Sequence, residues 1–263
     1  MNRTHLASFV IVSMMALLSG LPLWADVSDV PSFSADMIQK GPQGTTKAKV
    51  YVSKGRMRTD MARDGKKIIH IVDNSKHVQW MLYPAQRVYM ERPVPGQAPM
   101  TKPAEKNPCA LLKNAKCKNL GHEKVAGRDA IKWAITFAAK GKNAKGMQWI
   151  DVERGMPLRM EMPGGQKSEM KFLGMEKLNG RTVEKWELLS SQGSNPPQRT
   201  YQWYDPRLKL AVREEFPGGF VREMINIREG VQPDDLFTLP AGYKKMAPAP
   251  AGGGMPPRAR AAQ

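Results

Sequence analysis

The chain has 263 residues, of which 25% are charged, and a formal net charge of +17. This length is enough to bury a substantial core as a single domain. The strong positive charge favours anionic partners such as phospholipid head groups, lipopolysaccharide or acidic proteins.

The first residues have the pattern of a secretory signal peptide. Arg3 supplies the positive end, Leu6–Leu18 is apolar, and the small residue Ala25 follows a glycine and a proline. We predict that residues 1–25 are cleaved, which leaves 238 of the 263 residues and, with Arg3 gone, a charge of +16 in the periplasm. A retained membrane anchor is the alternative, but the apolar run is short for a span of ~20 residues. An exported protein rarely meets nucleic acid, so we expect no such partner.

Residues 45–91 alternate apolar and polar side chains, for example at Val50 and Val52 or at Trp80 and Leu82. Turn-forming residues separate these runs, which is typical of short strands joined by tight turns. Parallel strands would need crossovers of about a dozen residues, for which there is no room. We therefore expect an antiparallel meander, followed by a Pro-rich insertion over residues 93–118.

Cys109 and Cys117 are the only cysteines of the chain. In an oxidising compartment a pair eight positions apart predicts a local disulfide. The closed loop is short, so its stabilisation should fall below the ~3 kcal/mol that chain entropy assigns to a 15-residue loop. A metal or redox pair is the alternative, although the spacing is too long for Cys-x-x-Cys. The residues between the cysteines are good helix formers and predict a short helix.

The second half of the chain repeats itself. Residues 121–133 (GHEKVAGRDAIKW) and 174–186 (GMEKLNGRTVEKW) are identical at seven positions, and residues 148–165 and 202–219 at eight. We interpret this as an internal repeat, 121–173 and 174–228, in which each copy contributes about four strands and a Pro-Gly-Gly hairpin. The expected domain spans residues 26–245, and the Pro/Gly/Ala-rich residues 246–263 form a disordered tail.

Several segments resemble a known family. They are KVYVSKGRMRTDM, IIHIVDNSKHVQWMLYPAQRVYME, GxExVxGRxxxKW, QWxD and the closing DDLFTLPAGYKK. As a set they resemble the superfamily of the bacterial lipoprotein-sorting factors LolA and LolB, most closely a periplasmic domain family of unknown function within it. The resemblance implies a wide antiparallel sheet curved into an open half-barrel, with few short helices. It also implies a helical lid over a concave face that binds acyl chains, no enzymatic activity and no cofactor.

The predicted strands carry many tryptophan and methionine side chains, which would suit an adaptable apolar cavity. Ordinary core packing is the alternative for each of them. The candidates for lining the cavity are Trp80, Trp133, Trp149, Trp186, Trp203, Met160, Met162 and Met170.

Chemistry beyond apolar binding finds little support. Met160 and Met162, or Met57 and Met61, suggest Cu(I) ligation as a minor alternative, but no histidine or cysteine accompanies them at ligand spacing. We therefore assign no metal site. His70 flanks a predicted turn and is expected at the surface or a strand edge. No nucleophile with an adjacent base and no phosphate-binding loop is found, so we predict no catalytic residue and no enzyme.

Arginines recur at like positions of the two copies, Arg128 with Arg181 and Arg159 with Arg213. They are expected to form ion pairs on the solvent face with Glu123, Glu176, Glu161 and Glu215. A basic rim that meets lipid head groups is the alternative. The favoured function is a carrier for a hydrophobic or acylated ligand. The second hypothesis is an envelope interaction or stress-sensing module that binds a protein partner, and an anionic membrane surface is a further possible contact.

Overall fold

The computed structural model describes residues 30–94, 107–111, 114–139 and 142–246. The predicted signal peptide and tail, and most of the Pro-rich stretch, lie outside these residues. The described chain forms sixteen strands and two short 3-10 helices, η3 (Pro108–Leu111) and η4 (Asp234–Phe237). The strands are β1 (Phe33–Gly41), β2 (Gly44–Ser53), β3 (Arg56–Arg63), β4 (Lys66–Asp73), β5 (Val78–Tyr83), β6 (Val88–Pro93), β7 (Ala115–Val125), β8 (Arg128–Ala139), β9 (Lys142–Asp151), β10 (Pro157–Met162), β11 (Gln166–Leu178), β12 (Arg181–Gln192), β13 (Gln198–Asp205), β14 (Leu210–Phe216), β15 (Phe220–Glu229) and β16 (Lys244–Lys245).

All sixteen strands belong to one sheet, in the order β16-β6-β5-β4-β3-β2-β1-β15-β14-β13-β12-β11-β10-β9-β8-β7. The strands run antiparallel, apart from the two-residue β16, which pairs in parallel with β6. The predicted Pro-Gly-Gly hairpins join β10 to β11 and β14 to β15. Gly164 and Gly218, each with φ of 80°, take the positive φ that such turns need. The antiparallel meander is confirmed.

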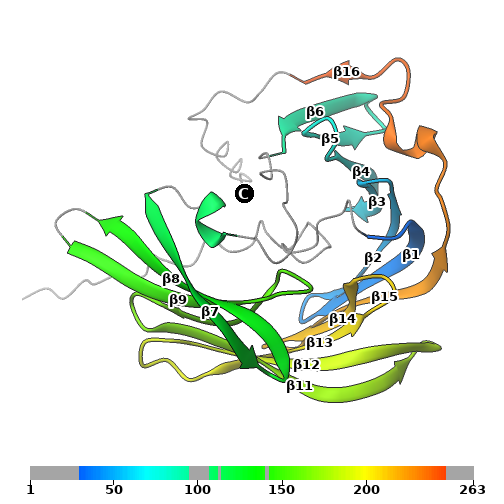
Figure 1. Ribbon diagram of the computed structural model, residues 1–263. Helices are drawn as coiled ribbons and strands as arrows, with labels where there is room; N and C mark the ends of the chain where they lie inside the picture. Colours follow the sequence, from blue (N-terminus) through cyan, green and yellow to red (C-terminus); the bar gives the residue numbers. More distant parts are fainter. Residues whose placement is uncertain (1–29, 95–106, 112–113, 140–141, 247–263) are drawn as a thin grey trace, which may run out of the picture.

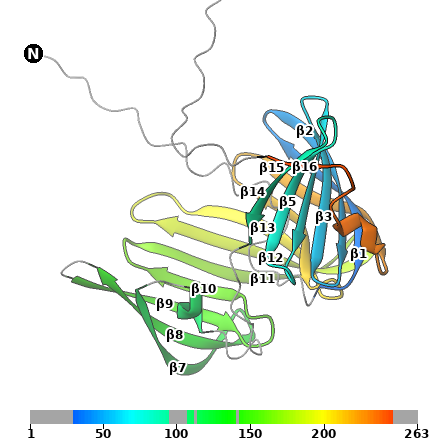
Figure 2. The ribbon, with the colours of Figure 1, turned by 90° about the horizontal axis from the view of Figure 1, so that it is seen from above.

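The pairing of β1 with β15 places the N-terminal meander beside the repeated half of the chain. From there the sheet bends strongly, with β16 at one end and β7 at the other, and these two ends do not meet (Figure 1). Figure 2 shows β1–β5 running at a steep angle to β7–β13, as the accumulated twist of a wide sheet requires. The open, curved half-barrel predicted for this chain is therefore confirmed.

The strand register defines two faces of the sheet. Directly paired residues lie on the same face, so Ala35, Val50, Thr59, His70 and Met81 form one row across β1–β5. We call the face that carries this row the concave face. Side chains of alternate residues point to the opposite, convex face.

The segment after β15 identifies the convex face. It runs along the outside of β3 and β4 (Figure 1), and its helix η4 buries Phe237 against Ile69, Ile71 and Trp80. In the described residues the short helix η4 therefore covers the convex face, whereas the family resemblance implied a helical lid over the concave one.

The two cysteines form the predicted disulfide, Cys109–Cys117. The helix predicted between them is only partly right. The 3-10 helix η3 ends at Leu111, and strand β7 begins at Ala115. Cys117 lies opposite Ile135 of β8, so the disulfide holds η3 close to the concave side of the sheet edge.

Candidate functional site

The register divides the five candidate tryptophans between the two faces. Trp186 pairs with Gln202, and the row continues through Glu214 and Arg222 to Gln39 on the concave face. Trp133 pairs with Gln148, and the row continues through Met160 and Ser168 to Ser190 on β12. Ser190 is four residues from Trp186 in the same strand, so the two rows lie on the same face. Trp133 and Trp186 are thus concave residues, as are the candidates Met160, Met162 and Met170.

Trp149 and Trp203 lie on the convex face, because each follows a concave glutamine in its strand. The Trp149 indole N–H donates to the Glu123 carboxylate at 2.9 Å. Lys132 Nζ and the Arg159 guanidinium carbon lie over the same ring, 4.9 and 4.7 Å from its centroid. These cations and the long side chains that carry them seal the ring from water, so Trp149 is buried although it lies on an outer face.

The second copy repeats this arrangement. Trp203 donates to Glu176 at 2.7 Å, and Lys185 and Arg213 lie 5.0 and 5.2 Å from the ring centroid. Each side chain is the counterpart of one around Trp149 at an offset of 53 or 54 residues. The hydrogen bonds from these indoles lower the pKa of Glu123 and of Glu176, so both carboxylates are charged at neutral pH.

Trp80 is the third convex tryptophan. It lies directly opposite Ile71 of β4, packs in the cluster with Phe237, and donates its indole N–H to Glu91 at 3.0 Å. Trp80, Trp149 and Trp203 therefore belong to the packing of the outer layer, and only Trp133 and Trp186 are placed where a concave-face ligand would contact the sheet.

The concave face of the repeated half carries exposed apolar side chains. Phe172 lies opposite Trp186, with the two ring centroids 5.1 Å apart, and it is 42% exposed. Phe220 is 44% exposed. Two glycines make room for this surface: a Cβ on Gly41 would lie 2.6 Å from the Phe220 ring, and one on Gly146 would lie 2.8 Å from the Met162 sulfur.

The indole N–H of Trp133 differs from those of the other four candidate tryptophans, which all donate to a glutamate. Its indole nitrogen is buried and finds no hydrogen-bond acceptor among the described residues. Trp186, its counterpart in the second copy, donates to Glu184 at 2.9 Å, but the position that corresponds to Glu184 in the first copy is Ile131. An unpaired donor of this kind is a point at which a ligand oxygen would be stabilised.

The predicted ion pairs are partly confirmed. Arg159 pairs with Glu161 and Arg213 with Glu215, each at 2.6 Å. The other two arginines pair differently from the prediction. Arg128 binds Asp151 and Arg181 binds Asp205, and both carboxylates are almost fully buried. Sequence reasoning did not find these two pairs, because the pairing of β8 with β9 and of β12 with β13 brings the partners together. The two aspartates also cap the turns that follow, by accepting backbone N–H groups of residues 153, 154, 207 and 208.

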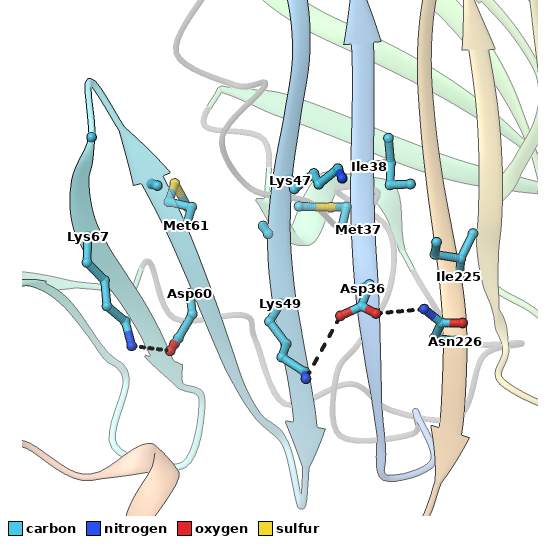
Figure 3. Close-up of a pocket in the computed structure, with 13 residues that line it drawn as sticks. Asp36, Met37, Ile38, Lys47, Lys49, Asp60, Met61, Lys67, Ile225 and Asn226 are labelled. Atoms are coloured by element: carbon cyan, nitrogen blue, oxygen red, sulfur yellow. Dashed lines mark hydrogen bonds and ion pairs between the residues drawn. The ribbon is translucent and has the colours of Figure 1, made fainter.

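A groove of about 570 Å³ opens on the sheet where β2 and β3 diverge (Figure 3). The pairing of these strands stops at Ala48 and Met61, although both strands continue. Met37, Ile38 and Ile225 contribute apolar lining. The sequence could not reveal this groove, since it depends on where the pairing of two strands ends.

Charged side chains line the same groove from the convex face. Lys67 pairs with Asp60 at 3.1 Å, Lys49 approaches Asp36 to 4.0 Å, and the Asn226 amide donates to Asp36 at 2.8 Å (Figure 3). Burial alone would raise the pKa of Asp60, but hydrogen bonds from Arg58 and Lys67 outweigh it and lower the pKa. With Lys47, three lysines face two aspartates, which leaves a net charge of +1 around the groove.

The described residues contain neither a cluster of metal-ligating side chains nor a membrane-spanning helix. No three His, Cys, Asp or Glu side chains gather as a metal site there. No helix in that part of the chain is long and apolar enough to cross a membrane.

Comparison with known proteins gives matches of two kinds. A family model described as a domain of unknown function (DUF4412) matches residues 34–153, which reach from β1 to the end of β9. No curated protein sequence matches.

Three solved structures illustrate the second kind of match. The LolA superfamily protein of Nitrosomonas europaea matches with 12% identity and a TM-score of 0.35, covering 80% of this chain and 91% of that one. A putative outer membrane lipoprotein-sorting protein domain from Vibrio parahaemolyticus has 16% identity, a TM-score of 0.30, and coverage of 79% and 89%. The Pseudomonas aeruginosa MucA/MucB complex has 13% identity, a TM-score of 0.23, and coverage of 80% and 97%.

All three TM-scores lie below 0.5, so the architecture rests on this chain's own strand order and register. The sequence predicted a resemblance of this kind. Proteins named for the LolA superfamily and for lipoprotein sorting are among those that this chain resembles, and the family model that matches its first nine strands is one of unknown function.

Proposed function

We propose that this protein is an exported, periplasmic binding protein that holds a lipid-like or acylated ligand against the concave face of its sheet, without catalysing a reaction. The proposal is carried by two exposed aromatic side chains on that face, Phe172 and Phe220, of which Phe172 packs against the buried Trp186. Exposed apolar surface on a curved, otherwise packed sheet is typical of a binding site for apolar groups.

The neighbouring contacts fit such a ligand. Gly41 and Gly146 leave space beneath Phe220 and the Met162 thioether, so the apolar surface lies close to the backbone. Methionine adapts its shape to irregular apolar partners, which suits an acyl chain. The unpaired Trp133 indole N–H supports the ester or amide carbonyl of an acylated ligand as its partner.

The groove between β2 and β3 supports a contact with anionic head groups. Its three lysines exceed its two aspartates, and the mature chain as a whole is basic. Such exposed contacts are screened over about 8 Å at physiological salt. Binding to anionic vesicles should therefore weaken at high salt, whereas acyl-chain binding on the concave face should not.

Titration with a fluorescent fatty acid, together with native mass spectrometry of gently purified protein, tests the proposal. We expect co-purified lipid and saturable uptake, and Phe172→Ser should weaken uptake about tenfold by removing apolar contact area. The matched control is Leu189→Ser. Leu189 lies on the next strand with similar exposure, 38%, but its register with Glu169 places it on the convex face. Ligand-free spectra and no uptake, or equal losses in both variants, would refute the proposal.

The second candidate is an interaction module for a protein partner in the envelope. Strand β7 favours it, because this strand of eleven residues ends the sheet and is paired only with β8 among the described strands. Free strand edges add strands from other chains, although the lysines and the bulge of β7 work against this. In-cell crosslinking from β7 that captures one protein, with no lipid uptake, would favour this candidate over the first.

A further inference from the structure

A histidine and two methionines stand side by side on the concave face of the N-terminal meander. His70 of β4 lies directly opposite Met81 of β5, which lies opposite Met90 of β6. Directly paired residues of antiparallel strands have Cβ atoms about 4.5–5.5 Å apart and share one face. One imidazole and two thioethers therefore lie in one row on the same face of three neighbouring strands, and all three residues are half-buried.

The His70 ring is held in a defined orientation. Its Nε2 lies 3.0 Å from the Gln79 side-chain oxygen. An amide oxygen only accepts hydrogen bonds, so Nε2 carries the proton and Nδ1 keeps a free lone pair. A neutral imidazole fixed through its other nitrogen is the usual state of a metal-ligating histidine.

The sulfur atoms complete a soft, uncharged set of ligands. The Tyr83 hydroxyl donates to the Met81 sulfur at 3.2 Å, which fixes that side chain and leaves its second lone pair free. Met61 lies on the same face, two residues beyond Thr59, which is the direct neighbour of His70. No cluster of three His, Cys, Asp or Glu is present among the described residues, so harder divalent ions lack a comparable site there.

We propose that His70, Met81 and Met90 form a binding site for Cu(I). Thioether and imidazole ligands select this soft monovalent ion. The site differs from the copper alternative drawn from the sequence, which rested on Met160 with Met162 or Met57 with Met61 and found no histidine near them. The fold supplies that histidine by aligning three strands. This inference does not depend on the proposed acyl-ligand function, whose exposed aromatic residues lie on β11 and β15.

Anaerobic titration of the purified protein with Cu(I), in competition with a chromophoric Cu(I) chelator, tests the site. We expect one Cu(I) per chain. Gln79→Leu should weaken Cu(I) binding about 10–100-fold, because it removes the hydrogen bond that orients the His70 ring. Met81→Leu and Met90→Leu should weaken Cu(I) binding at least as much. Leucine conserves the volume of methionine, so these variants should keep the fold.

Met160→Leu is the matched control, because Met160 lies on the same concave face but on β10, in the repeated half. Circular dichroism establishes that each variant is folded, and the His70 ring 15N shifts on Cu(I) addition show whether Nδ1 is the ligand. Stoichiometric binding that is lost in Met81→Leu and Met90→Leu and kept in Met160→Leu supports the site. No stoichiometric binding, unchanged affinity in both ligand variants, or an equal loss in Met160→Leu would overturn it.

Discussion

The two copies of the repeated half build their convex surface with the same contacts but differ at their edges and on their inner face. Around Trp149 and Trp203 the glutamate, the lysine and the arginine all have counterparts. In contrast, Cys117, four residues before the first copy begins, corresponds to the buried Met170, four residues before the second begins. The outer layer is thus a shared building unit.

The differences follow from position in the sheet. The first copy ends at the free edge, where β7 has no neighbour beyond it in the described chain, and there a disulfide replaces core packing. The second copy begins in β11, in the interior of the sheet, and just before that start Met170 fills the corresponding place with apolar volume. What the copies share is therefore structural, and a ligand site is expected among the positions in which they differ.

The largest expected effect is the loss of either convex tryptophan. Trp149→Ala and Trp203→Ala should each lower the free energy of unfolding by about 3–5 kcal/mol, because each removes a buried indole. Urea denaturation provides the measurement. If one substitution proves nearly neutral while the other destabilises strongly, the two outer layers are not equivalent. The phenylalanine variants serve as controls, since they keep most of the apolar area and should lose less.

Next in size is the buried arginine–aspartate pair of each copy. Arg128→Ala and Arg181→Ala should each cost about 3 kcal/mol, because each leaves an almost fully buried carboxylate without its counter-charge. Arg199→Ala is the control. Its pair with Glu187 involves a side chain that is 64% exposed, and removing it should cost about 1 kcal/mol or less. Equal losses in all three variants would contradict a special role for the buried pairs.

The disulfide comes third. Replacing both Cys109 and Cys117 by serine should lower the free energy of unfolding by about 2 kcal/mol, the stabilisation expected for a loop this short. Equilibrium unfolding with and without reductant checks it: wild type should respond to reductant and the double variant should not. Wild-type stability that is the same in both conditions would show that the edge of the first copy needs no covalent support.

The smallest expected effect concerns Arg154, which forms two 2.7 Å hydrogen bonds with Glu184 and corresponds to the fully buried Leu208 in the second copy. Arg154→Leu should cost about 1.5 kcal/mol at neutral pH by removing a charged hydrogen-bond pair. Leu208→Ala is the comparison at the corresponding position. It creates a cavity and removes no charge, so the loss in the free energy of unfolding that it causes should not depend on pH.

The pH dependence identifies the cause. Burial alone would raise the pKa of Glu184, but the hydrogen bonds from Arg154 and Trp186 outweigh it and hold the pKa below 4.5. A carboxylate with a lowered pKa stabilises the fold fully above pH 4.5, and this contribution is lost as the pH falls through the folded-state value. The difference in the free energy of unfolding between wild type and Arg154→Leu should therefore become smaller below pH 4.5. A difference that stays constant with pH would assign the effect to packing.

The strands and hairpins could be predicted because their signals are local. The alternation of apolar residues predicts the strands, and the Pro-Gly-Gly segments predict the hairpin turns. Both patterns involve only residues that are close together in the sequence. The curved half-barrel came from resemblance to a family. The helix expected from Cys109 to Cys117 was mostly wrong, because pairing of β7 with β8 overrides the helix propensity of that segment.

The candidate site was less accessible to sequence reasoning. Whether Trp133 or Trp149 lies on the concave face depends on the register between strands, which the positions of the tryptophans in the sequence do not reveal. His70 was expected at the surface or a strand edge, but it is half-buried in the middle of β4, and its proximity to Met81 and Met90 follows from the pairing of three strands.

The bulges of β7 and β11 have a further consequence. Both strands break their register at the same place, around Gly121 and Gly174, where the two copies begin. The boundary between copies thus falls inside a strand and not in a loop. Joining Gly121 directly to Met175 would excise 53 residues, fuse the first part of β7 to the last part of β11, and keep every side chain on its original face. In a sheet with such a boundary, one recombination event can add or remove a whole repeat copy. The width of the sheet, and with it the depth of the concave face, can therefore change in a single genetic step.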